Sequence, residues 1–412
     1  MKKIGLTIFL SLALNAIAFT QTHSLEYYLH QALANSPLLK DYQYQVQSSQ
    51  IDSQRIRAGY RPQVTGNSVN SYAPVIGGFG YDYAITNGGL LSALISVNKT
   101  LVGQKNLSTQ LESIQINNQS ISNASKISEQ DLKRSITSQY ITAYGDLQQL
   151  NFSKEIYELL SKEEVILKAL TQNNVYRQTD YLTFLVTLQQ QALTLKQIRI
   201  QFQNDYGTLN YLAGINDTSM AALDEPGINL APLPDFYQSI FYRKFEIDSL
   251  KLMNEKALIG FSYKPRVNLF ADGGFNSSFT YKGYKNFGTS FGLSLSVPIY
   301  DGKQKQMQYH KLSIAEMVRV KYKEFFSRQY IQQLAQLHQQ LSSTEELLVQ
   351  INDQIRYAET LITAHGRLLQ TGDAKISDYI IALNTYLNAK NLLTQNNITR
   401  LQIMNQINYW NR

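Results

Sequence analysis

The chain has 412 residues, with 38 Lys or Arg against 31 Asp or Glu, so its formal net charge is +7. The basic residues form no cluster along the sequence, and this weakly basic balance argues against nucleic-acid binding. The chain contains no cysteine, which excludes disulfides, thiolate chemistry and a lipid-modified N-terminal cysteine.

The first 18 residues have the composition of a cleaved signal peptide. Lys2 and Lys3 precede an apolar run that ends with the small residues Ala16 and Ala18. A basic start, a short apolar stretch and a small-x-small end are typical of secretory signals. The run is short and Asn15 interrupts it, which disfavours a membrane-spanning helix. We therefore expect residues 1–18 to be removed and the mature chain to be exported.

Residues 19–223 are predicted to form a helix, two strands and a long helical hairpin. Between Gln104 and Asn173 the chain has no proline and a single glycine, and its apolar residues recur every three or four positions, as in a coiled-coil seam. A second helix returns after a break near Asn174. The predicted limits of the first helix and the two strands are Leu25–Tyr60, Val64–Tyr72 and Leu90–Leu101, and the Gly-rich segment between the two strands is predicted to be a loop.

The second part of the chain repeats this order. The Pro- and Gly-containing segment 224–234 is the predicted linker, and residues 235–412 form the second repeat. Tyr60-Arg61-Pro62 returns as Tyr263-Lys264-Pro265, 203 residues later (265 − 62), and Asp180-Tyr181 returns as Asp378-Tyr379, 198 residues later (378 − 180). Landmarks in the same order at a nearly constant offset indicate an internal repeat. Its predicted helix and strands are Phe236–Phe261, Arg266–Asn276 and Thr289–Tyr300.

The last predicted strand has one apolar face. Its apolar residues alternate with Gly292, Ser294 and Ser296, the two-residue period of a strand. We expect the apolar set to face lipid or a packed barrel surface. This set is Phe291, Leu293, Leu295 and Val297.

The two breaks in the helical pattern are predicted to be the tips of helical hairpins. Asn174 and Gly372 occupy equivalent positions, and both residue types adopt the left-handed conformation that ends a helix. Because the first half uses Asn174, asparagine is expected to be tolerated at position 372. Thr179 and Ser377 are candidate N-caps of the return helices.

Four strands per chain are too few to close a barrel, since even a filled barrel needs about eight. An exported chain with strands of about ten residues and one apolar face is typical of outer-membrane barrels. The expected fold is therefore mainly α with a small β part: long antiparallel coiled-coil hairpins, and four strands contributing to a barrel shared between subunits.

Several segments resemble the TolC-like outer-membrane efflux protein family along nearly the whole mature chain. The segments are "SLEYYLHQALANSPLL", "YRP" and "YKP" before the first strands, "LSVPIYDGKQK", and "TGDAKISDYIIALNTYLNAK". The resemblance implies a homotrimer whose twelve strands form one outer-membrane barrel and whose helices form a periplasmic tunnel. It also implies export of small molecules or proteins, together with a periplasmic adaptor and an inner-membrane transporter of the RND or ABC type.

The resemblance also suggests roles for residues at the tips. Asp180 and Asp378 match the positions of an acidic ring that narrows the periplasmic entrance, although helix-dipole stabilisation alone would also favour them there. A second aspartate found in some members is Ile381 here, and the tyrosine and arginine of some gate ties correspond to Leu369 and Ala374. We therefore expect a different tie, made by Arg177 or Lys375. Asn174, Gly372, Thr179 and Ser377 are the expected tip residues for adaptor contact.

Two other classes of protein are weaker alternatives. The five histidines fall in no metal-ligand spacing, and no nucleophile motif is present, so we expect no enzyme activity, no metal and no cofactor. A trimeric coiled-coil adhesin or filament would predict one continuous heptad array without the doubled pairs of strands. The histidines are His23, His30, His310, His338 and His365.

Overall fold

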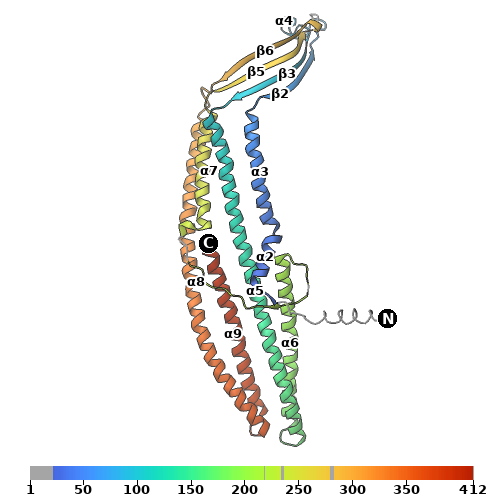
Figure 1. Cartoon of the computed structure of the whole chain (residues 1–412), viewed down its shortest axis with the longest axis vertical. Coiled ribbons are helices and arrows are strands. Elements are labelled where there is room, and N and C mark those ends of the chain that lie inside the picture. Colours follow the sequence, from blue (N-terminus) through green and yellow to red (C-terminus); the bar gives the residue numbers. More distant parts are fainter. Residues whose placement is uncertain (1–21, 218, 233–235, 279–282, 412) are drawn as a thin grey trace, which may run out of the picture. The chain divides into compact units, whose positions relative to one another are not determined.

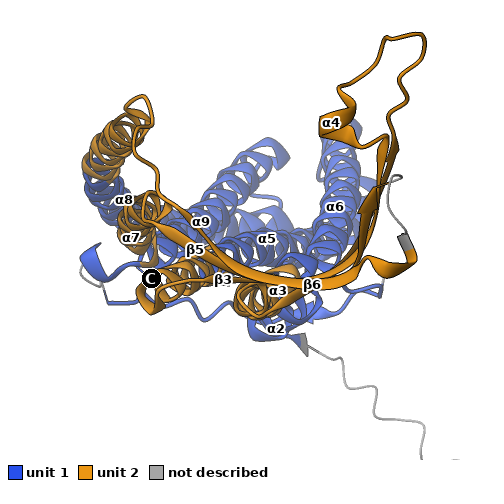
Figure 2. Ribbon diagram, turned by 90° about the horizontal axis from the view of Figure 1, so that it is seen from above, with its two compact units in different colours: residues 1–39, 126–239, 327–412 blue, residues 40–125, 240–326 orange. Residues whose placement is uncertain are grey.

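A computed structural model describes residues 22–217, 219–232, 236–278 and 283–411 (Figure 1). The predicted signal peptide lies outside these residues. The described chain divides into two compact units, and each unit combines segments from both halves of the sequence (Figure 2). Unit 1 comprises residues up to Leu39, Lys126–Ser239 and Ser327–Arg412, and unit 2 comprises Lys40–Ser125 and Ile240–Phe326.

Unit 1 is almost entirely helical. Two helices run through both units, and unit 1 contains their C-terminal parts: α5 (Gln104–Gln172) and α8 (Gln304–Thr371). Each is followed by a return helix, so that α5 with α6, and α8 with α9, form two helical hairpins. The remaining elements of unit 1 are α2 (Leu25–Asn35), α6 (Gln178–Ala213), α9 (Ile376–Trp410), the 3-10 turn η1 (Phe236–Gln238) and the short parallel strands β1 (Thr22–His23) and β4 (Ala222–Leu223).

The predicted helix Leu25–Tyr60 is wrong in one respect, because it is broken after Asn35. Ser36 has an extended backbone with ψ of 114°, and α3 (Pro37–Gly59) begins at the next residue. A proline disfavours the helical conformation in the residue before it, so Ser36 ends α2 and Pro37 starts α3, where its fixed φ and missing N–H are tolerated.

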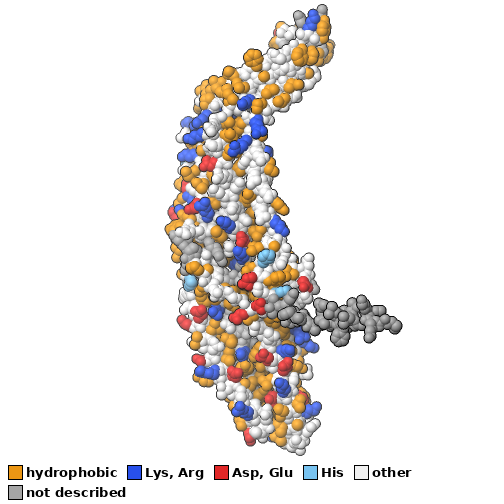
Figure 3. All heavy atoms as spheres, in the orientation of Figure 1, with side chains coloured by type: hydrophobic (Ala, Val, Ile, Leu, Met, Phe, Trp, Pro, Cys, Tyr) orange, Lys and Arg blue, Asp and Glu red, His pale blue; other side chains and the backbone are white. Residues whose placement is uncertain are grey.

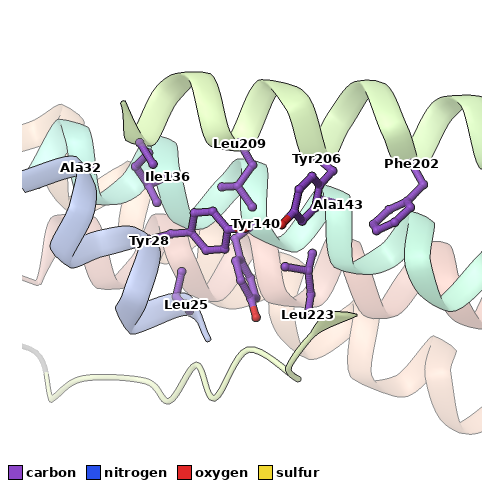
Figure 4. Packing of buried hydrophobic residues seen from close by; sticks show 11 residues of the cluster. Leu25, Tyr28, Ala32, Ile136, Tyr140, Ala143, Phe202, Tyr206, Leu209 and Leu223 are labelled. Atoms are coloured by element: carbon purple, nitrogen blue, oxygen red, sulfur yellow. The ribbon is translucent and has the colours of Figure 1, made fainter. Parts of the chain in front are cut away.

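One core of unit 1 combines aromatic and aliphatic residues, most of them on α2, α5 and α6 (Figure 4). Tyr28 on α2 and Tyr140 on α5 are both 0 % exposed, and Tyr206 on α6 is 2 % exposed. The Tyr140 hydroxyl donates to the carbonyl oxygens of His23 at 2.9 Å and Asp224 at 2.8 Å. This side chain therefore fastens the segments that carry β1 and β4 to α5.

A second core of unit 1 joins the two hairpins near their tips. Leu160 and Leu167 on α5 lie in the same buried cluster as Leu369 on α8 and Tyr379 on α9. Phe184 of α6 packs in this cluster as well, and its ring centroid lies 6.5 Å from that of Tyr379. The hairpins are thus held together mainly by apolar burial, the dominant favourable contribution to packing.

Unit 2 contains a four-stranded antiparallel sheet with the order β2-β3-β5-β6. The predicted pairs of strands are confirmed, with limits that coincide or differ by at most four residues. Both outer strands, β2 and β6, pair on one side only among the described residues. The elements of unit 2 other than α5 and α8 are α3, β2 (Gln63–Tyr72), α4 (Tyr83–Thr86), β3 (Gly89–Leu101), α7 (Ile240–Ser262), β5 (Arg266–Ser278), η2 (Gly283–Lys285) and β6 (Phe287–Ser296).

The register gives the sheet two chemically different faces. Leu293 pairs with Leu269, and Leu295 with Val267, so these apolar residues share one face. Ser294 pairs with Asn268 on the opposite face, because directly opposed residues on paired strands point to the same side. The apolar face is exposed in the single chain: Leu293 is 68 % exposed.

Two details of the strands differ from expectation. The strand predicted over Thr289–Tyr300 ends at Ser296, because Pro298 has no backbone N–H to donate to a sheet. The segment between β2 and β3, predicted to be a loop, contains the short helix α4, which the Asp82 side chain caps by accepting from the Ala84 N–H at 2.8 Å. Among the described helices, none has both the length and the hydropathy required to cross a membrane.

Candidate functional site: the hairpin tips

The two hairpin tips in unit 1 end their first helices by the same backbone motif. Asn174 has φ of 60° and Gly372 has φ of 83°, which confirms the predicted left-handed residues. The next N–H groups, of Val175 and Asp373, each donate to the carbonyl five residues earlier, those of Leu170 and Leu368, at 2.9 Å. These bonds satisfy carbonyl groups that the ends of α5 and α8 would otherwise leave without a partner.

The tips touch each other at Gly372. A Cβ atom placed on Gly372 would lie 2.8 Å from Cγ1 of Val175, which is closer than real Cβ contacts come. Glycine is therefore required there for two reasons, its positive φ and the adjacent side chain of the other hairpin. The expectation that asparagine fits at position 372 considered only the first reason, and the short distance to Val175 argues against it.

Tyr176 connects the first tip to the second. Its hydroxyl lies 2.8 Å from the carbonyl oxygen of Leu369 and 3.0 Å from that of Ala374. Burial raises the pKa of this hydroxyl, with a further contribution from the charge of Asp373, so it remains protonated and able to donate. Leu369 and Ala374 are the positions that the resemblance matched to a gate tyrosine and arginine. In this chain their backbone carbonyls accept from a tyrosine of the other hairpin.

The predicted tie residues lie at the starts of the two return helices. Arg177 and Lys375 are the N-cap residues of α6 and α9. In the part of the chain that the structure describes, neither side chain forms an ion pair. Their carbonyls accept from the N–H groups of Asp180 and Asp378 at 3.1 Å each.

The candidate caps Thr179 and Ser377 do not cap the helices. Both helices begin one residue before these positions, and neither has a side-chain cap. The Ser377 hydroxyl instead lies 3.2 Å from a carboxylate oxygen of Asp378. Asp180 and Asp378 are half-buried in the first turns of α6 and α9, a position that the helix dipole favours.

A buried carboxyl group lies between the hairpins close to these contacts. Glu163 of α5 is 8 % exposed, and its Oε1 accepts from the Gln370 side-chain amide of α8 at 3.3 Å. Its Oε2 is buried without a hydrogen-bond partner among the described residues. Burial raises the pKa of this carboxyl, while the Gln370 hydrogen bond opposes the shift.

This carboxyl predicts a pH-dependent stability of the joint between the hairpins. A folded-state pKa above the unfolded value means that stability is highest below pH 4.5, the ordinary pKa of a glutamate, and is lost as pH rises through the raised pKa. Glu163→Gln removes the charge and keeps the shape. At neutral pH we expect the variant to have a higher melting temperature than the parent protein and a free energy of unfolding larger by on the order of 1 kcal/mol. At pH 4 this difference should shrink. A difference that does not change with pH would contradict this explanation.

Sequence patterns could not identify Tyr176, Glu163 or Gln370. The partners of Tyr176 are backbone carbonyls, which carry no residue-specific signal. Glu163 is one glutamate among several on α5, and only the position of α8 shows that it is buried.

Neither a protein-family model nor a curated protein sequence matches the chain. Solved structures, in contrast, match it over 94 % of its length. The outer-membrane channel OprN has a TM-score of 0.74, 14 % identity and 90 % of its own chain covered. For CusC the TM-score is 0.75, with 13 % identity and 91 % covered. For the outer membrane protein VceC of Vibrio cholerae it is 0.74, with 13 % identity and 96 % covered.

The chain therefore has the fold of outer-membrane channels. More particularly, its fold is that of the TolC-like efflux channels, and the resemblance inferred from the sequence is confirmed at the level of the fold.

Proposed function

We propose that this protein is an outer-membrane channel that exports small molecules or proteins from the periplasmic side. The observation that carries the proposal is the sheet of unit 2, which combines an exposed apolar face, a polar face and two open edges. In a channel wall, the apolar face contacts lipid and the polar face contacts water. We assign Phe291, Leu293 and Leu295 to the lipid-facing side, whereas Val297, predicted to belong to the same face, follows the end of β6.

The open edges support a barrel shared between copies of the chain. An unpaired strand edge exposes backbone N–H and C=O groups, and lipid offers these groups no hydrogen-bond partner. Pairing β6 of one chain with β2 of the next satisfies both edges at once. Three copies would supply twelve strands, enough to close a barrel.

A disulfide test distinguishes this arrangement directly, since the chain has no cysteine of its own. One cysteine is placed at Asn67 in β2 and a second is moved along residues 290–296 of β6. Within one chain, β3 and β5 separate these strands by roughly 14 Å, whereas a disulfide needs Cβ atoms about 4 Å apart. We expect oxidation in membranes to link chains into dimers and trimers at alternate positions along β6. Monomers at every position would exclude the shared barrel.

The implied partners are a periplasmic adaptor and an inner-membrane transporter of the RND or ABC type. The hairpin tips are the proposed adaptor contact, because Asn174, Thr179 and Ser377 are exposed there and Gly372 shapes the turn. Low charge on the helices, with many Gln, Asn, Ser and Thr, suits the wall of a water-filled tunnel.

We further propose that Asp180 and Asp378 contribute an acidic ring at the tunnel entrance, with Arg177 and Lys375 beside it. The variant Asp180→Ala with Asp378→Ala should assemble normally, because a helix-start carboxylate contributes only about 0.3–1 kcal/mol. Its single-channel conductance, cation preference and block by multivalent cations should change. If all three equal those of the parent channel, the aspartates act only as helix-start residues.

A further inference from the structure

Basic residues flank the four junctions between the long helices α3, α5, α7 and α8 and the strands of unit 2. Arg57 and Arg61 lie where α3 meets β2, and Lys99 and Lys105 lie where β3 meets α5. All four side chains are exposed.

The other two junctions are built in the same way. Lys264 and Arg266 lie where α7 meets β5, and Lys303 and Lys305 lie where β6 meets α8. All except the half-buried Lys305 are exposed. We call these eight residues, two at each junction, the basic collar.

Almost no acidic residue accompanies the collar. In residues 57–66, 97–106, 262–268 and 299–306, Asp301 is the only one. Its carboxylate accepts from the backbone N–H groups of Lys303 at 2.8 Å and Lys305 at 2.7 Å, and these hydrogen bonds keep its pKa below the usual value. The Asp301 carboxylate is therefore bound to the backbone of the adjacent turn. The collar keeps a strong local excess of positive charge.

The collar borders the apolar face of the sheet. Lys99 pairs with Leu269, so it lies on the apolar face near its end, next in the register to the pair Leu101 and Val267. Just beyond β6, Ile299 and Tyr300 are 95 % and 83 % exposed. Figure 3 shows Lys and Arg side chains gathered beside the hydrophobic side chains of the sheet.

Aromatic rings lie among the cations of the collar. The Lys264 Nζ is 4.5 Å from the ring centroid of Phe261, and the Lys305 Nζ is 5.5 Å from that of Tyr263. An apolar band followed by aromatic rings and then by basic groups is the order that matches acyl chains, the interface and headgroups of a membrane leaflet.

We propose that the basic collar binds the headgroup phosphates of anionic phospholipids in the leaflet next to the helices, and so fixes the depth of the barrel in the membrane. This inference rests on the proposed channel function. Charge complementarity selects the lipid, because each exposed Lys or Arg near a membrane surface attracts anionic headgroups over about one Debye length.

The test compares two purified variants with the parent protein. The collar variant carries Arg61→Gln, Lys99→Gln, Lys264→Gln and Lys303→Gln, one change at each junction. The matched control removes four exposed cations from the helices of unit 1: Lys168→Gln, Lys196→Gln, Arg199→Gln and Arg367→Gln. Each protein is delipidated and mixed in detergent with equal amounts of phosphatidylglycerol and phosphatidylcholine, and bound lipid is measured by native mass spectrometry.

The parent protein and the control should retain phosphatidylglycerol in preference to phosphatidylcholine. In the collar variant, the preference for phosphatidylglycerol should fall about fivefold for each cation removed. In the parent protein, added salt should weaken the same preference. No preference in the parent, or an unchanged one in the collar variant, would overturn the proposal. Displacement of the lipid by an equal concentration of inorganic phosphate would also overturn it, because the site would then bind free phosphate.

The disulfide test separates this proposal from the channel function on which it rests. Chains that form cross-linked membrane trimers but show no preference for phosphatidylglycerol refute the collar alone. Chains that stay monomeric in the disulfide test refute the shared barrel, whatever lipid they bind.

Discussion

Leu293→Arg should prevent the chain from assembling in the outer membrane, whereas Ser294→Arg should assemble. The two positions are adjacent in β6, but their strand partners, Leu269 and Asn268, lie on opposite faces of the sheet. An arginine on the lipid face of a barrel costs up to about 2–4 kcal/mol, the value at the bilayer midplane. In a trimer the cost is incurred three times, which is comparable with the whole stability of a typical domain. On the polar face the same side chain reaches water.

The measurement is the amount of each variant in the outer-membrane fraction and its migration as a trimer. Leu295→Arg provides a graded comparison. Leu295 lies one residue from the end of β6, whereas Leu293 lies further inside the strand, so its replacement should be less severe because the cost falls toward the interface. If Leu293→Arg and Ser294→Arg assemble equally well, the assignment of the two faces is wrong.

Local patterns predicted the strands and the turns because local physics determines them. Alternation of Leu293 and Leu295 with Ser294 and Ser296 already separates the two faces. Asn174 and Gly372 are residue types that accept positive φ, and both adopt it. These features require no knowledge of what packs against them.

Contacts between distant segments could not be predicted in this way. Tyr176 and the Leu369 carbonyl are 193 residues apart, and nothing near either one in the sequence indicates the other. The failed capping prediction has a similar cause. Thr179 and Ser377 have suitable side chains, but α6 and α9 begin at Gln178 and Ile376. Each candidate therefore lies inside the first turn with a helical backbone, whereas an N-cap residue precedes the helix and has a non-helical backbone.

The joint between the hairpins combines two kinds of contact. The Tyr176 hydroxyl binds two carbonyls and does not titrate near neutral pH, whereas Glu163 can gain or lose a proton. Both contacts lie around Gln370 and Leu369 at the end of α8. A change at Gly372, only a few residues away, should therefore disturb the joint as well as the turn.

Gly372→Asn should weaken the contact between the tips even though asparagine tolerates the backbone angle. The new Cβ would lie 2.8 Å from Val175 Cγ1, and a β-branched valine has little rotamer freedom with which to move away. Such overpacking typically costs about 1–3 kcal/mol. Gly372→Val should be worse, because a β-branched residue, unlike asparagine, costs about 1–2 kcal/mol more in the left-handed region.

A second substitution separates the two causes. Val175→Ala removes the colliding methyl group, so it should restore most of the melting temperature lost by Gly372→Asn but only part of that lost by Gly372→Val. Asn174→Gly is the matched control at the equivalent turn, where the left-handed angle is kept, and it should change stability by a few tenths of a kcal/mol at most. Thermal unfolding of the detergent-purified proteins gives these values, and single-channel recordings show whether the tips still close against each other. If Gly372→Asn melts like the parent protein, the tips do not touch at Val175 in the assembled channel, and glycine at position 372 serves the turn alone.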